Sequence, residues 1–141
     1  MTRNDLFAQL TVGLNADLVD YGELKKLLAG QFDAALQHQS ARLGELAEAI
    51  TGLAERIEAR RRQRVALVNA LLVDDYAPSM DKVLALLPDA PRRMLAGWWG
   101  ELESLVRECK TLNTRSCQLL MDQHEIMQRV LNGEADIYAP A

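Results

Sequence analysis

Residues 95–131 read LAGWWGELESLVRECKTLNTRSCQLLMDQHEIMQRVL, and this stretch decides the fold. Its apolar residues recur at spacings of three, four and seven, which is typical of one long amphipathic helix. These residues are Leu95, Trp98, Leu102, Leu105, Val106, Cys109, Leu112, Leu119, Leu120, Ile126, Met127, Val130 and Leu131. After Ser116 they cover an arc of roughly 140°, wider than a two-helix seam needs, and Met121 lies outside that arc. Such a helix is either entirely core, or it packs on its own fold and keeps apolar surface for a partner.

A second set of heptads lies upstream of this stretch, between residues 33 and 72. One heptad position holds Leu36, Leu43, Ile50, Ile57 and Leu71, and another holds Leu46, Leu53 and Leu67. Gln39, Arg60 and Arg64 interrupt the seam. A helix of this length would reach roughly 60 Å, so it needs another element to cover it.

Start and stop signals divide the rest of the chain. Asn4 or Asp5 can cap a first helix, and Gly30 is placed to end it. Ser79 can cap a short helix, and Asn132-Gly133 is placed to end the last one. The expected elements are helices at about 4–28, 33–72, 79–87 and 91–132, followed by a mobile tail at 133–141. The prediction is an all-α fold: a single domain, residues 1–141, forming an antiparallel helical bundle or coiled coil of three long helices plus a short connecting helix.

Composition narrows the class of protein. The chain has 141 residues, 5% of them aromatic, and a formal net charge of -4. This charge argues against nucleic acid as the main partner. No apolar run approaches the length of a membrane span, so no stable membrane insertion is expected. Charges at Arg3 and Asp5 stand where a secretory leader would be apolar, which predicts a cytoplasmic protein.

Residues suited to catalysis or metal binding are scarce. Neither His38 nor His124 follows a glutamate by three residues, and no Cys-x-x-Cys pair occurs. Cys109 and Cys117 are too far apart on one helix to form a disulfide, so we expect reduced thiols in or near the core. We therefore predict no enzyme activity, no cofactor and no metal. The basic run at residues 60–64 is either a phosphate- or acid-binding patch or the solvated part of a long helix.

The candidate binding face lies on the last helix. It comprises Leu119, Leu120, Met121, Ile126, Met127, Val130 and Leu131. Methionine is flexible and is common at surfaces that accept a partner helix. The arrangement favours a helix-in-groove mode, in which an amphipathic segment of a partner lies on this face.

Several of these segments resemble the FlgN-type flagellar export chaperones. The C-terminal third carries the more specific part of the resemblance, and the similarity extends over nearly the whole chain. The matching segments are Leu112-Asn113, Ser116, Leu119-Leu120, Ile126-Met127, 130–133 and 137–140, with 27–33 and Trp98 earlier in the chain. The chain departs from the family at Arg115-Ser116, where Asn-Gly is usual, and at Ala139, where glycine is usual.

The resemblance implies a cytoplasmic chaperone without catalytic activity or cofactor. Such chaperones bind the C-terminal helical segments of the two hook–filament junction proteins, prevent their premature association and deliver them to the flagellar type III export apparatus. Carried over by position, the candidate binding face would hold the cargo, and Tyr138 would dock at the export gate.

Two other classes of protein fit the same helical pattern. One is a coiled-coil adaptor or structural protein with no export role, in which the heptads mediate self-association into a homo-oligomer. The other is an enzyme or a metal-binding bundle, for which the sequence offers no ligand motif.

Overall fold

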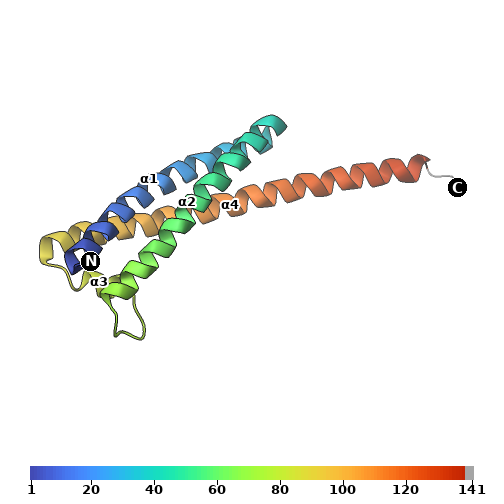
Figure 1. Ribbon diagram of the computed structural model, residues 1–141. Coiled ribbons are helices and arrows are strands. Elements are labelled where there is room, and N and C mark those ends of the chain that lie inside the picture. The colour runs from blue at the N-terminus through green and yellow to red at the C-terminus, as the bar shows by residue number, and fades with distance from the viewer. Residues whose placement is uncertain (139–141) are drawn as a thin grey trace.

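The computed structural model describes the backbone of residues 1–138 and the side chains of residues 1–132, and it is all-α (Figure 1). Its helices are α1 (Arg3–Leu36), α2 (Ser40–Leu71), α3 (Met80–Leu84) and α4 (Asp89–Tyr138). No strand occurs among the described residues. The predicted bundle of three long helices and one short helix is confirmed.

The helix α1 is the central element, because it packs against both α2 and α4. Consecutive long helices run antiparallel, so α1 and α4 point in the same direction (Figure 1). The α1–α2 hairpin ends at residues 37–39, whereas α4 continues well past it. The molecule is therefore a three-helix bundle from which the C-terminal part of one helix projects.

The core is concentrated at the end of the bundle that α3 covers. Val83 of α3 is fully buried, and Trp98 and Trp99 pack half-buried against the same cluster, as expected for tryptophan near a bundle end. The buried apolar residues here are Leu10, Leu14, Leu67, Val68, Met80, Val83, Leu84, Leu95 and Leu102. This cluster joins all four helices at that end of the bundle.

The bounds of α1 differ from the prediction at both ends. Thr2, not Asn4 or Asp5, is the N-cap: its hydroxyl accepts from the Asp5 amide, and the Asp5 carboxylate accepts from the Thr2 amide. The helix also continues through Gly30, which faces Leu46 closely enough that an added Cβ would meet it at 3.8 Å. Packing against α2 outweighs the weak helix preference of glycine.

The turn between α1 and α2 therefore falls later than predicted. Residues 33–36 belong to α1, and His38 makes the turn with a φ of 54°, in the left-handed region. Within α2 the heptad residues Leu46, Leu53, Ile57 and Leu67 are buried, as their spacing indicated. Leu36 was wrongly assigned to that seam: it lies on α1 and is exposed.

The two remaining helices start and stop at other residues than expected. Ser79 caps α3 as predicted, its hydroxyl accepting from the Lys82 amide, but α3 is shorter than 79–87. The helix α4 begins at Asp89 and passes through Gly133 to Tyr138, so a tail at 133–138 was wrongly predicted. One glycine costs about 1 kcal/mol in a helix, too little to end it unless the chain turns away. Residues 139–141 lie outside the described residues.

Candidate functional site

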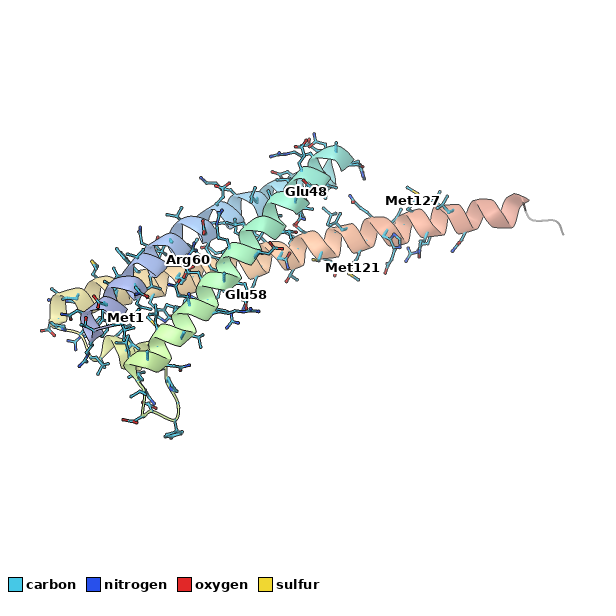
Figure 2. The ribbon with its side chains drawn as sticks, in the orientation of Figure 1. Met1, Glu48, Glu58, Arg60, Met121 and Met127 are labelled. Carbon is cyan, nitrogen blue, oxygen red and sulfur yellow. The ribbon has the colours of Figure 1, made fainter. Side chains whose placement is uncertain are left out.

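The candidate site is the distal segment of α4, defined here as residues 117–132, which lies beyond most of the bundle. Figure 2 shows Met121 and Met127 on this projecting part of the helix. Its large apolar side chains are open to solvent: Leu120 36%, Met121 60%, Ile126 59%, Met127 56%, Val130 53% and Leu131 57% exposed. A contiguous apolar surface of this kind usually marks an interaction site.

The point at which α4 leaves the bundle is defined by contacts with the end of α1. Leu119 is half-buried at this junction. The Gln123 side-chain amide donates a 2.8 Å hydrogen bond to the carbonyl oxygen of Ala35, in the last turn of α1. Beyond Gln123 every described side chain of α4 is exposed. Of the predicted cargo-binding residues, Leu119 thus lies where the segment leaves the bundle, and the six others lie along the segment. The side chain of Tyr138 lies outside the described side chains.

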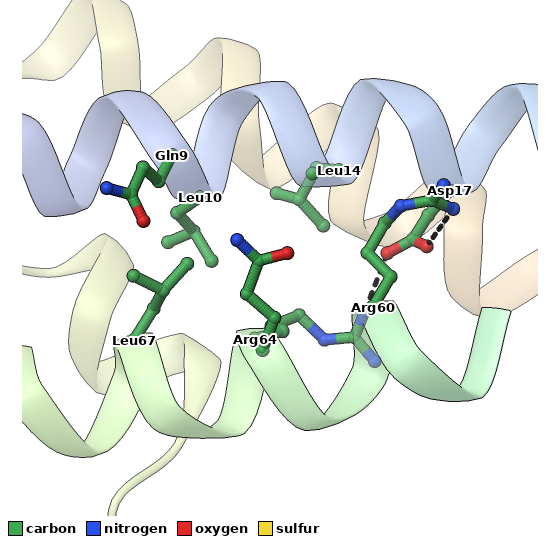
Figure 3. Close-up of a pocket in the computed structure, with 9 residues that line it drawn as sticks. Gln9, Leu10, Leu14, Asp17, Arg60, Arg64 and Leu67 are labelled. Carbon is green, nitrogen blue, oxygen red and sulfur yellow. Dashed lines mark hydrogen bonds and ion pairs between the residues drawn. The ribbon is translucent and has the colours of Figure 1, made fainter. Parts of the chain in front are cut away.

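A second feature is a cluster of ion pairs across the α1–α2 seam (Figure 3). Asp17 is 1% exposed, and its carboxylate accepts from Arg60 at 3.0 Å and from Arg64 at 2.6 Å. Asp20 accepts from Arg60 at 2.8 Å and from Arg56 at 3.2 Å. These ion pairs join α1 to α2 in the observed register and leave neither buried carboxylate without a partner.

The ion pairs revise the interpretation of the basic run. Arg60 and Arg64 point inward to the α1 carboxylates, whereas Arg61 and Arg62 pair with Glu58 on α2 itself. The run is therefore mainly engaged within the fold, not wholly solvated as one reading supposed. The cavity beside Asp17 measures only about 10 Å³, room for no more than one water molecule, so it is no ligand site.

Sequence reasoning missed Asp17 and Asp20. A signal was present: Asp17 follows Leu14 by three residues and precedes Tyr21 by four, so it falls within the apolar face of α1. Burial alone would raise the pKa of Asp20, but hydrogen bonds from Arg60 and Arg56 outweigh this and hold it below its usual value. Asp20 is accordingly ionised at neutral pH and attracts both guanidinium groups.

The cysteines lie in different surroundings. Cys109 is buried, and its Sγ donates to the Tyr21 carbonyl oxygen at 3.7 Å. Burial raises the pKa of the Cys109 thiol, which keeps it protonated for this contact. Cys117 is exposed, so its expected place in or near the core was wrong.

The described part of the chain lacks two features that other functions would need. No group of three or more His, Cys, Asp or Glu side chains within it is arranged to hold a metal ion. Among the same residues, no helix has the length and apolar character needed to cross a membrane.

The fold and the uncovered apolar segment together define the class: a small helical bundle that leaves one helix face open, as helical chaperones and adaptors do. Residues 1–133 match the family model described as FlgN protein, so the chain belongs to the FlgN family of flagellar export chaperones. This is a family of chaperones and not of enzymes. No curated protein and no solved structure matches the chain.

Proposed function

We propose that this protein is a cytoplasmic chaperone of flagellar type III export whose clients are the hook–filament junction proteins. It binds their C-terminal helical segments on the distal segment of α4, keeps them from assembling too early and delivers them to the export apparatus. Tyr138, the last residue of α4, is the proposed contact with the export gate. Family membership supports the general role, and the client and the site are our proposal.

One observation carries this proposal: the apolar side chains of the distal segment are exposed where the bundle has ended. Ile126, Met127, Val130 and Leu131 are each more than half exposed, although the same helix buries Leu95 and Leu102 almost completely. Exposed apolar groups on a helix cost free energy in water, at roughly 25 cal/mol per Å². A partner that covers them recovers this free energy.

The energetics suit a client that must later be released. A segment that is disordered when free pays conformational entropy when it folds on the chaperone, which lowers the affinity gained per unit of buried area. Several long apolar side chains are then needed to leave a favourable net free energy. The distal segment offers six that are exposed, from Leu120 to Leu131, along about three turns.

Sedimentation velocity with and without a client peptide tests the proposal. We expect the protein to form a defined complex when a peptide from the C-terminus of a junction protein is added, because the peptide covers the distal segment. A peptide of the same composition in scrambled order is the control and should leave the sedimentation profile unchanged. Self-association that neither peptide alters would contradict the chaperone role and favour the coiled-coil adaptor.

A further inference from the structure

One series of seam residues runs the length of α4 at intervals of seven, and its burial ends where α1 ends. The series is Leu95, Leu102, Cys109, Ser116, Gln123 and Val130. The first four members are 5% exposed or less, Gln123 is half-buried, and Val130 is 53% exposed. The exposed apolar face of the distal segment is therefore the same seam that packs against α1, continued past the end of its partner.

A second series of residues, each one position before a seam residue, flanks this seam. It comprises Glu108, Arg115, Asp122 and Arg129, and the first two contact α1. Glu108 forms a 2.6 Å ion pair with Lys25, and the Arg115 guanidinium lies 3.8 Å from the centre of the Phe32 ring. Both contacts join residues that are 83 positions apart, so α1 and α4 keep a constant register. The next two members of the series are Asp122 and Arg129, and α1 ends at Leu36, before it reaches them.

We propose that the client segment binds as a single α-helix that continues the line of α1 along the distal segment. Its apolar residues pack on Ile126, Met127 and Val130. On the flank of the client helix, a cationic side chain faces Asp122. Seven residues further along the client, an anionic side chain faces Arg129. This inference rests on the proposed function, and it adds the client's conformation, its position and its charge pattern.

Continuity with the α1–α4 interface favours a helix over an extended segment. Seam residues that recur every seven positions on α4 pack against side chains that recur at the same interval on a partner helix, as they do against α1. An extended chain would press some of its backbone amides and carbonyls against the apolar face, where neither water nor α4 could pair with them, whereas a helix pairs its own. From Gln123 to Asn132, the last residue whose side chain is described, the seam is long enough for roughly 10 residues of partner helix.

Gln128 provides a matched control for the position of the client. It is exposed, as Val130 is, but it points about 140° away from Gln123 in the seam at 100° per residue. We expect Val130→Asp to weaken binding of a client peptide at least about tenfold in titration calorimetry, because a charge would face the apolar client. Gln128→Asp should leave the affinity within about twofold.

The outcomes separate this inference from the proposed function. If the wild-type protein binds no C-terminal peptide, the proposed function fails and the inference with it. If the wild-type protein binds but Gln128→Asp weakens binding as much as Val130→Asp, the proposed function stands and the proposed position of the client on the seam is wrong. Far-UV circular dichroism of both variants confirms that each retains its helix content.

Charge reversal on α4 tests the proposed charge pattern of the client independently of the apolar contacts. Reversing both flank charges, with Asp122→Arg and Arg129→Glu, should weaken client binding about five- to tenfold at low salt, since each favourable pair becomes a repulsion. This loss should shrink at high salt, where surface charges are screened. Glu125→Arg is the control, because Glu125 points away from the seam. No loss at low salt in the double variant, or an equal loss with Glu125→Arg, would contradict the proposed charge pattern.

Discussion

Changing Leu120 and Val130 together to aspartate should reduce affinity for a client peptide by a hundredfold or more, about 3 kcal/mol, while helix content persists. Both side chains lie on the exposed apolar face, at 36% and 53% exposure. Burying a large apolar side chain contributes about 1.5–3 kcal/mol, and an unpaired charge in its place adds a desolvation cost. Titration calorimetry measures the affinity, and far-UV circular dichroism measures the helix content.

The matched control changes two glutamines with the same spacing on the polar side of the segment. Gln118 and Gln128 are both exposed and lie outside the apolar arc. Gln118→Asp combined with Gln128→Asp adds the same charge to α4 and should leave the affinity within about threefold, since neither side chain would face the client. Wild-type affinity in the Leu120/Val130 variant would show that the client binds elsewhere.

Asp17→Ala should lower the free energy of unfolding by about 3–5 kcal/mol, the usual cost of removing one partner of a buried ion pair. Asp17 is 1% exposed and accepts from two guanidinium groups. Its removal leaves Arg64 without its α1 partner and Arg60 with Asp20 alone. Urea unfolding at neutral pH, followed by circular dichroism, measures the change.

Glu58→Ala is the comparison for that experiment. Glu58 also accepts from two arginines, Arg61 and Arg62, but all three side chains lie on the surface of α2. Exposed pairs of this kind contribute little to stability, so this variant should unfold close to the wild type. Equal destabilisation by the two substitutions would mean that the buried ion pairs of Asp17 contribute no more to the free energy of unfolding than the exposed pairs of Glu58.

The fold was largely predictable because apolar spacing determines which helix faces are buried. The heptads of α2 and the spacing along α4 identified Leu46, Leu53, Leu95 and Leu102 correctly as inward-facing. Helix ends were less predictable, since they depend on contacts that the local sequence does not contain. Gly30 looks like a stop in the sequence, yet the packing of α1 on α2 near Leu46 keeps it helical.

The polar contacts between α1 and α2 were not predictable in the same way. An interruption of the apolar face is visible on each helix, at Asp17 in α1 and at Arg60 and Arg64 in α2. Which interruption opposes which depends on the register of the hairpin, and the misplaced turn at Gly30 shifted that register. With the turn at residues 37–39, the opposite charges face one another.

The excess of apolar surface on α4 could be predicted from the width of its arc, and its position outside the bundle could not. The arc leaves two possibilities, a covered core helix or a helix with a free face. The structure distinguishes them because the α1–α2 hairpin ends at residues 37–39, near Gln123 of α4, so Ile126 and Val130 lie beyond the last turn that could cover them.

Hydrogen–deuterium exchange along α4, with and without a client peptide, tests the central claim most directly. In the free protein, amides in the distal segment should exchange faster than those near Leu95 and Leu102, which are held by the core. Addition of the peptide should slow exchange across residues 119–131. Slowed exchange confined to α1 and α2, with the distal segment of α4 unchanged, would contradict the claim that the client covers this face.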